Sequence, residues 1–389
     1  MNQTLQKLSR LQKITAVIAI VGLSFCCLGL VWDRHVFYVS YLFAFVFWAG
    51  LSFGCFYAAM IHYLTGGRWG FPARRFFEAG FMTLPVMAVL LIPIFFGVHE
   101  LYPWAQPDIV AADKALQQRS SYENFTAFLA RAVVFFNIWI FIAARLRIWS
   151  LRQDFTQDAA PTIKIRALSG PAIAIVPLTT SFAFIDWAMS IETNWYSTIF
   201  PVIILAGQLL TAFAFVTVVL AWIGNEILSD EQAGKMFHDL GNFLLAFVMF
   251  WTYVAFSQVI IIYSTNLPHE ISWYLRRISG GWLVLVAFVA LFHFFAPFFL
   301  LLFRTVKKNV RTLAVIALLL FIVHALAMYW VVAPTFYPQI HVHWTAFAAW
   351  FGIGGLWLTV FLENLKTHPL LARNDPRAPK PIAQTADAK

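Results

Sequence analysis

Ten apolar runs, each long enough to cross a membrane, constrain this chain more than any other feature. They lie near residues 12–32, 38–64, 75–98, 125–147, 168–189, 197–224, 238–264, 275–303, 312–333 and 342–364. A helix needs about 20 mostly apolar residues to cross a hydrocarbon core of about 30 Å. Hydrophobic residues make up 61% of the chain and charged residues 12%, whereas a soluble domain carries roughly a quarter charged residues. The sequence therefore predicts an all-α integral membrane protein with about ten transmembrane helices.

The basic residues lie in short segments between the apolar runs rather than in a separate basic domain. If the N-terminus is cytoplasmic, 21 of the 27 Lys and Arg residues fall on the cytoplasmic side. The remaining six are Arg34, Lys114, Arg119, Arg131, Arg276 and Arg277. The positive-inside rule then predicts that both termini are cytoplasmic, as an even number of spans requires. Because membrane topology accounts for the net charge of +9, no nucleic-acid partner is expected.

The two ends of the chain and its cysteines bear on processing and cofactors. The first apolar run follows basic residues but no cleavage site follows it, so we expect it to be retained as a helix. Residues 1–366 are predicted to form one polytopic membrane domain, and the polar tail 367–389 to be disordered. Cys26, Cys27 and Cys55 lie inside apolar runs without a CxxC or CxxCH motif. We therefore expect no covalent haem and no metal held by this chain.

One weak internal repeat suggests how the helices group. Segments 40–50 and 197–207 share Ser, Phe, Ala and Gly at corresponding positions, which gives the second and sixth runs equivalent places in the chain. The pattern favours two four-helix bundles, formed by helices 2–5 and 6–9, with helices 1 and 10 flanking them.

Ionisable groups inside the apolar runs are few, and each needs a partner or a wet cavity, because an unpaired charge in hydrocarbon is costly. In the fifth run Thr179, Ala183, Asp186 and Ser190 recur at helical spacing and form a small or polar stripe. Arg131, in the fourth run, lies at a similar depth. The two residues predict a structural ion pair or a protonatable site, and the two roles are compatible.

The seventh run carries the longest polar line. Its members, which recur at steps of three, four or seven residues, are Asn242, Ala246, Met249, Tyr253, Ser257 and Ser264. A stripe of this kind either supports a chain of water molecules or mediates helix packing. Asn242, Tyr253 and Ser257 are therefore candidates for proton transfer.

Three histidines and a glutamate complete the candidates for proton transfer. His62 closes the second run and Glu78 opens the third, so both are expected at one membrane surface. They would serve there as partners of nearby arginines or as a funnel for protons. His293 and His324 lie well inside the eighth and ninth runs. This pair is a candidate proton relay, with a hydrogen-bonded structural pair and ligation of a b-type haem as the alternatives.

Four segments together carry a family pattern. They are Phe37-Tyr38 with Tyr41-Leu42-Phe43-Ala44-Phe45; Met60-Ile61-His62-Tyr63-Leu64-Thr65-Gly66-Gly67-Arg68-Trp69-Gly70 with Arg74-Arg75; Leu101-Tyr102-Pro103-Trp104; and Asp186-Trp187-Ala188-Met189-Ser190-Ile191-Glu192-Thr193-Asn194-Trp195-Tyr196-Ser197-Thr198-Ile199-Phe200. Over helices 2 to 6 the chain resembles the second, smaller NrfD-like membrane subunit of alternative complex III. That complex is a bacterial quinol:electron-acceptor oxidoreductase.

The resemblance implies ten helices in the bacterial inner membrane, beside a larger NrfD-like membrane subunit, an iron–sulfur subunit and multihaem cytochrome subunits. Haem and iron–sulfur clusters would belong to those partners. Quinol, quinone and lipid are the small molecules that this chain would meet. Asp186 matches the acidic position of the family's Asp-Trp motif, but helix 4 offers Asn137 where the larger subunit has a histidine. This departure favours proton conduction or anchoring over quinol oxidation by this chain itself.

The resulting prediction is a subunit that is not catalytic alone. Electrons would leave quinol in or beside a partner, while this chain would offer a proton path and a membrane anchor. Carboxylates and imidazoles can exchange protons, and Ser, Tyr and Asn can hold water molecules between them. The alternatives are an independent secondary transporter and a purely structural anchor.

Overall fold

The computed structural model describes residues 2–193, 195–224 and 230–377, and it contains helices and no strand in those ranges. Ten helical segments are long and apolar enough to cross a membrane. They are Thr4–Trp32, Arg34–Thr65, Gly70–Phe96, Phe125–Gln153, Ala160–Met189, Phe200–Ile223, Ala233–Thr265, Trp282–Leu302, Val310–Phe336 and Trp344–Lys366. The prediction of an all-α membrane fold with ten spans is confirmed, and most helices extend a few residues beyond the predicted apolar runs.

Seven of the ten spans are single helices. They are α1 (Asn2–Trp32), α2 (Arg34–Thr65), α9 (Phe125–Gln153), α11 (Phe200–Ile223), α12 (Asp230–Thr265), α17 (Val310–Phe336) and α18 (Trp344–Lys366). Short helices lie in the connections: α6 (Val98–Leu101), η1 (Pro103–Ala105), α7 (Pro107–Ala112), α8 (Lys114–Arg119), α13 (Pro268–Ile278) and α16 (Arg304–Lys308).

Three spans are interrupted. The third consists of α3 (Gly70–Phe81), α4 (Leu84–Leu90) and α5 (Ile92–Phe96). A proline lies in the first turn of both α4 and α5, where its missing N–H is tolerated. The fifth runs from α10 (Ala160–Phe184) into the π-helix η2 (Ile185–Met189). The eighth contains a second π-helix, η4 (Ala290–Phe295), between α14 (Trp282–Val289) and α15 (Ala296–Leu302). Both π-helices carry a titratable candidate residue.

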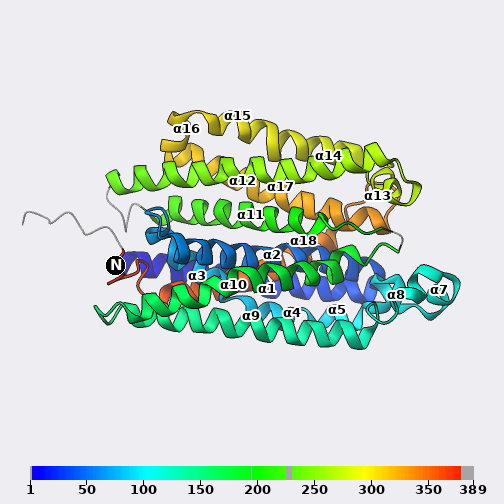
Figure 1. Cartoon of the computed structure of the whole chain (residues 1–389), viewed down its shortest axis with the longest axis horizontal. Helices are drawn as coiled ribbons and strands as arrows, with labels where there is room; N and C mark the ends of the chain where they lie inside the picture. The colour runs from blue at the N-terminus through cyan, green and yellow to red at the C-terminus, as the bar shows by residue number, and fades with distance from the viewer. Residues whose placement is uncertain (1, 194, 225–229, 378–389) are drawn as a thin grey trace, which may run out of the picture.

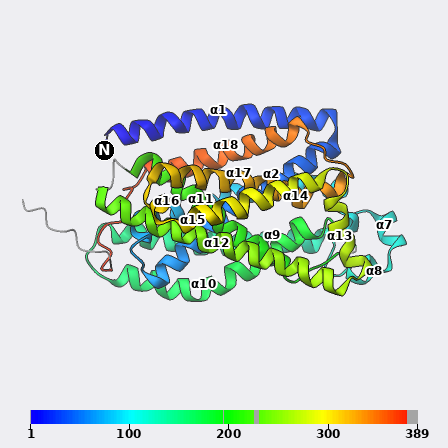
Figure 2. The ribbon, with the colours of Figure 1, turned by 90° about the horizontal axis from the view of Figure 1, so that it is seen from above.

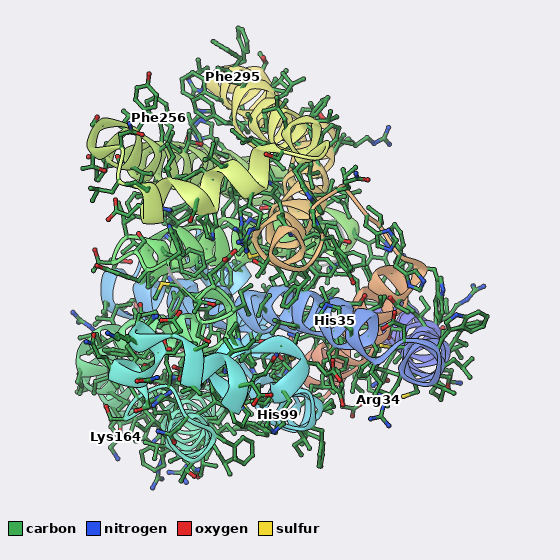
Figure 3. The ribbon with its side chains drawn as sticks, turned by 90° about the vertical axis from the view of Figure 1, so that its right-hand side faces the viewer. Arg34, His35, His99, Lys164, Phe256 and Phe295 are labelled. Atoms are coloured by element: carbon green, nitrogen blue, oxygen red, sulfur yellow. The ribbon has the colours of Figure 1, made fainter. Side chains whose placement is uncertain are left out.

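The spans group as predicted into two bundles. In one, α2 packs against α3, α4 and α10, and α9 packs against α10; in the other, α11 packs against α12 and α17, while α14 and α15 close the outer side (Figure 1). Seen from one end, the second bundle lies beside the first, with Phe256 and Phe295 at its periphery (Figure 3).

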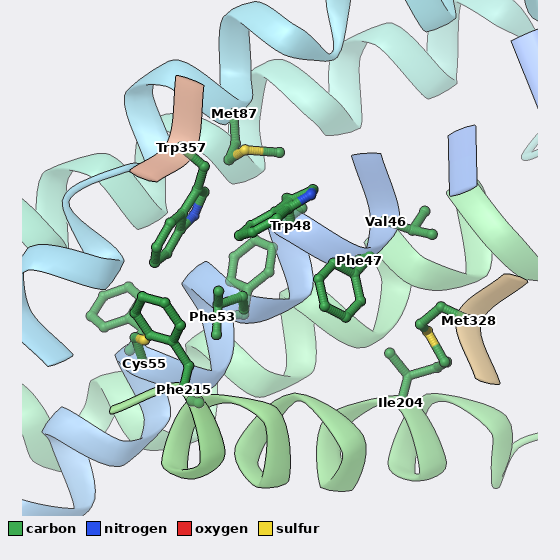
Figure 4. Close-up of a cluster of buried hydrophobic side chains, with 14 of the residues drawn as sticks. Val46, Phe47, Trp48, Phe53, Cys55, Met87, Ile204, Phe215, Met328 and Trp357 are labelled. Atoms are coloured by element: carbon green, nitrogen blue, oxygen red, sulfur yellow. The ribbon is translucent and has the colours of Figure 1, made fainter. Parts of the chain in front are cut away.

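The two bundles meet at α2 and α11, which are the helices that carry the internal repeat. A Cβ on Gly54 would lie 1.9 Å from the backbone oxygen of Gln208, so only glycine allows this approach. Aromatic side chains fill the space on either side. On one side Trp357 of α18 contacts both Trp48 of α2 and Phe215 of α11 (Figure 4). On the other, Phe53 of α2 packs against Trp139 of α9.

Helices α1 and α18 pack against each other along most of their length and flank the bundles (Figure 2). Glycines permit the close approach, since a Cβ on Gly22 would lie 2.6 Å from the Cα of Gly352. At Gly355 it would lie 2.6 Å from the backbone nitrogen of Ala19. Small residues at a helix crossing are the usual means of bringing membrane helices together.

The N-terminal helix begins at the same end of the bundles as the segment 367–377, which we call the terminal end (Figure 1). The connection 97–124 and α13 lie at the opposite end, which we call the loop end. Residues 367–377 of the predicted tail lie against the ends of the helices, and Asp375 is buried. The charged side chains of this segment find partners at the ends of the helices, which composition does not reveal. Residues 378–389 lie outside the described part.

Candidate functional site

An ion pair near the loop end joins the fourth and fifth spans. Arg131 donates from Nε to one carboxylate oxygen of Asp186 at 2.8 Å and from Nη2 to the other at 3.0 Å. Its Nη1 donates to the backbone oxygen of Tyr122, and the guanidinium lies 3.8 Å from the centre of the Tyr122 ring. The predicted pair is present with bidentate geometry, the arrangement in which guanidinium and carboxylate bind each other most strongly.

The π-helix η2 positions Asp186. A π-helix widens the backbone by one residue per turn and often occurs at functional sites, and here it turns Asp186 and Trp187 toward the interior, where both are buried. Two side chains of the connection 97–124 fix it from outside. The Tyr102 hydroxyl donates to the backbone oxygen of Trp187 at 3.1 Å, and the Trp104 indole donates to the Ser190 hydroxyl at 3.1 Å. Two segments far apart in the sequence are thereby locked together.

Glu123 lies between this pair and the loop-end surface, and the sequence analysis did not single it out. Its carboxylate is 3.4 Å from Arg119 and its side chain is 13% exposed. Burial raises the pKa of Glu123, and the nearby charge of Arg119 does not cancel that rise. In the sequence, Glu123 stands directly before Asn124, which caps α9, and this position was the signal that could have identified it as a candidate. Glu123 is therefore a carboxyl group suited to accept a proton near the surface.

A second cluster at the loop end connects the two bundles. Glu192 accepts from Arg276 and Arg277, both at 2.9 Å, and from the Thr335 hydroxyl at 2.7 Å. Burial lowers the pKa of Arg277 to about 10, although the negative charge of Glu192 acts to raise it. Arg277 therefore stays charged at neutral pH. The sequence analysis quoted Glu192 within a motif but did not predict this cluster, because its partners come from other spans.

A cavity of about 460 Å³ opens beside this cluster at the loop end. Connections from both bundles line it, and its charged or titratable lining residues are His35, Glu100, Glu192 and Arg276. The cavity is large enough for a small molecule or for a side chain of a docked protein.

Glu78 forms the centre of a buried network at the terminal end. Its two oxygens accept hydrogen bonds from five side chains: Tyr63, Arg74, Arg75, Arg147 and Ser150. Every one of these groups is buried. The network fills the acceptor capacity of the carboxylate, and a proton could reach Glu78 only if some of these bonds opened.

The segment 367–377 closes over this network. Asp375 accepts from Arg74 at 2.8 Å, and Arg377 donates to the backbone oxygen of Tyr63 at 2.7 Å. The backbone nitrogen of Arg373 donates to Asp154 at 2.8 Å. Burial raises the pKa of Asp375, but the hydrogen bonds and charge of Arg377, with the charge of Arg74, outweigh burial and hold that pKa below its ordinary value.

His62 lies at the same end but does not bond to Glu78. It is fully buried, and neither ring nitrogen has a hydrogen-bond partner among the described residues. Its ring contacts Trp69 and Phe71 edge-on. Gly70 leaves room for it, since a Cβ there would lie 2.0 Å from Nδ1 of His62. His62 and Glu78 therefore lie at the same end of the bundles, as expected, but their side chains do not bond to each other.

Polar side chains also lie where α2 and α10 of the first bundle meet α11 of the second. A narrow void that admits no water molecule is lined by Tyr57, Thr180, Ser181 and Gln208, among others. Tyr57 and Gln208 are buried, and the side-chain polar atoms of Gln208 have no partner in the described part of the chain. A continuous water path through this region would require small movements of the side chains.

The polar line of the seventh span faces outward. Tyr253 is 71% exposed and Met249 48% exposed. Asn242 accepts from Lys307 at 2.8 Å near the terminal end, and the Ser257 hydroxyl donates to the backbone oxygen of Tyr253. These residues therefore line no interior channel of this chain. A helical period identifies a common face, but it does not say whether that face is inside.

The histidines of the second bundle do meet. The rings of His293 on η4 and His324 on α17 are stacked with centroids 5.3 Å apart and an interplanar angle of 29°. Stacked rings turn their faces, not their nitrogens, toward each other, so a haem iron does not fit between them. Within the described ranges, no group of three or more His, Cys, Asp or Glu residues is arranged to hold a metal ion.

Comparison with known proteins adds no assignment. No family model matches the chain, and no curated protein matches it.

Proposed function

We propose that this chain is a membrane subunit of a respiratory quinol:electron-acceptor oxidoreductase of the alternative complex III type. It would lie in a bacterial inner membrane with both termini in the cytoplasm. Its part would be to anchor the complex and to offer a proton path beside a quinol-oxidising partner. Haem and iron–sulfur clusters would belong to partner subunits, and this chain would carry no metal.

One observation carries the proposal. Two of the segments that resemble the family lie about 85 residues apart in sequence, yet Tyr102 and Trp104 bond to Trp187 and Ser190. These contacts enclose the π-helix that presents Asp186 to Arg131. A buried ion pair supported in this way is unusual inside a membrane protein and marks a functional site by default.

The arrangement of acids in the first bundle supports proton transfer. Asp186 and Glu123 lie toward the loop end, and Glu78 lies toward the terminal end. Tyr57 and Thr180 lie in the bundle between those ends. Carboxyl groups at both ends of a bundle, with hydroxyl groups between them, are the components that proton transfer requires. Asp186 would release and accept the proton while Arg131 holds its side chain in place.

The outer face of the seventh span supports the claim that the chain works with partners. Tyr253 is twelve residues from the end of the span at Thr265, or roughly 18 Å at 1.5 Å per residue. A hydroxyl at that depth finds no acceptor in lipid. A serine can donate to its own helix, as Ser257 does, but a tyrosine hydroxyl is too far from the backbone. A neighbouring protein helix would supply the acceptor.

A purely structural anchor is the second candidate function. The observation that favours it is the saturation of Glu78 by five donors, which is the geometry of a clamp between helices rather than of a proton carrier.

The test is affinity purification of the tagged chain from the membranes of its native host in mild detergent. The proposal predicts co-purifying haem and iron–sulfur subunits and oxidation of a quinol by the purified assembly. A monodisperse protein that purifies alone and moves a solute would contradict it and favour a transporter.

A further inference from the structure

His293 and His324 form a buried site of their own in the second bundle. They are 0% and 3% exposed, and neither forms an ion pair or a hydrogen bond in the ranges that the structure describes. The Trp251 ring lies 4.3 Å from that of His293, and Phe47 contacts His324. Gly207 makes space for the second ring, because a Cβ there would lie 2.3 Å from Cε1 of His324.

Several polar atoms around this pair have no partner. Both ring nitrogens of His293 and Nδ1 of His324 are buried without a hydrogen bond, as is the indole nitrogen of the neighbouring Trp251. Such groups are rare in folded proteins, because each loses its bonds to water and gains nothing in return. Buried water molecules are the usual partners of such groups.

The backbone at this site repeats a feature of the first bundle. Two π-helices occur among the described spans, and each presents one titratable side chain: Asp186 on η2 and His293 on η4. Asp186, in the fifth span, pairs with Arg131 in the fourth, and His293, in the eighth span, stacks on His324 in the ninth. The widened turn therefore serves the same purpose in both bundles, namely to turn a proton-binding group toward a partner.

We propose that His293 and His324 bind internal water molecules and pass a proton between their rings through them. A ring that receives a proton becomes an imidazolium. Its N–H then donates to the water, and the water donates one of its own protons to the free nitrogen of the second ring. The first ring is neutral again, the second is charged, and the water is regenerated. The second bundle thus has a proton site separate from Asp186.

Water at the site is tested by radiolytic hydroxyl-radical labelling, in which bound water generates the radical locally. The full chain is irradiated in lipid nanodiscs with any subunits that co-purify, and each rate is divided by that of the unfolded chain. His293 and His324 should react at least tenfold faster than the equally buried Trp139 and Trp357. Rates equal to those of the two tryptophans would overturn the proposal.

Proton exchange is tested by deuterium incorporation at the imidazole C2 position, which needs both a protonated ring and access to water. His293 and His324 should incorporate deuterium with a sigmoidal dependence on pH, more slowly than His35, whose side chain is 41% exposed. No incorporation at either ring would overturn proton transfer even if water were present. Because both measurements concern the rings and not quinol oxidation, failure of the proposed function would leave their outcome unaffected.

Discussion

Arg131 holds both carboxylate oxygens of Asp186, 55 residues further along the chain, through two nitrogens of one guanidinium group at 2.8 and 3.0 Å. The carboxylate side chain is 5% exposed and the guanidinium 18%. Two spans are therefore joined near the loop end by a pair that water hardly reaches. The pair has a structural role, which removal of Arg131 tests, and a proposed role in proton transfer, which a change of Asp186 tests.

Arg131→Gln should reduce assembly. It removes the cation and leaves Asp186 charged in a low-dielectric environment, which costs about 3–5 kcal/mol in buried pairs. The measurement is the amount of intact protein in the membrane and its unfolding temperature in detergent. The control is Arg34→Gln, which alters an exposed arginine at the same end. Equal yield and stability for the two variants would show that the pair does not stabilise the fold.

Gly22→Ala should weaken the contact between α1 and α18. The added methyl group would lie 2.6 Å from the Cα of Gly352, and overpacking of this kind costs about 1–3 kcal/mol. Gly170→Ala is the matched control, because its methyl group would meet nothing within 4 Å and alanine favours helix. Thermal unfolding in the same detergent should show a lower midpoint for the first variant only. A lower midpoint for both, or for neither, would contradict this description of the interface.

The docking of residues 373–377 should weaken in acid. The folded-state pKa of Asp375 lies below its unfolded value, so its stabilising contribution is complete above about pH 3.9 and is lost as the pH falls through the folded value. Hydrogen exchange of the Arg373 and Arg377 amides, which donate to carboxylates, reports the docking. After correction for intrinsic rates, protection should fall with acidification below that point. In Asp375→Asn, protection of the Arg377 amide should be low throughout, and unchanged protection would argue against the contact.

Tyr253→Phe should loosen the association of this chain with its partners, whereas Tyr263→Phe should not. Both side chains are exposed on the same helix, 71% and 79% respectively. Tyr263 lies two residues from the end of the span, where aromatic belts are normal. A hydrogen bond within the membrane contributes about 1 kcal/mol, so roughly a fivefold loss in subunit retention is expected on size-exclusion chromatography. Equal retention would place the partner elsewhere.

The number and approximate limits of the spans follow from the sequence, because hydrocarbon thickness fixes the length of an apolar helix. The ion pair between Arg131 and Asp186 was also predictable, since isolated charges at similar depth have few partners. The orientation of the seventh span could not be predicted, because periodicity shows which residues share a face of the helix but not whether that face is buried or exposed. The outward position of Tyr253 shows the difference.

Long-range charge clusters were the other part that the sequence did not specify. Glu78 was recognised as an acid at a membrane surface, but its partner Arg147 comes from another span, and Asp375, which binds the Glu78 partner Arg74, comes from the tail. The Glu192 cluster likewise draws Arg277 and Thr335 from distant segments. Such networks depend on how helices are placed around one another, which hydropathy does not determine.

Proton movement in the assembled complex tests the central claim most directly. Asp186→Asn keeps the volume and most of the hydrogen-bonding capacity of the side chain, but the amide cannot exchange a proton at accessible pH. Quinol oxidation and pH change are measured together in vesicles that contain the wild-type or the variant complex, with subunit content checked in both. The account predicts a fully assembled variant in which turnover, or the proton movement linked to it, is reduced. An unchanged rate and proton stoichiometry would contradict it and leave Asp186 as a structural residue of an anchor subunit.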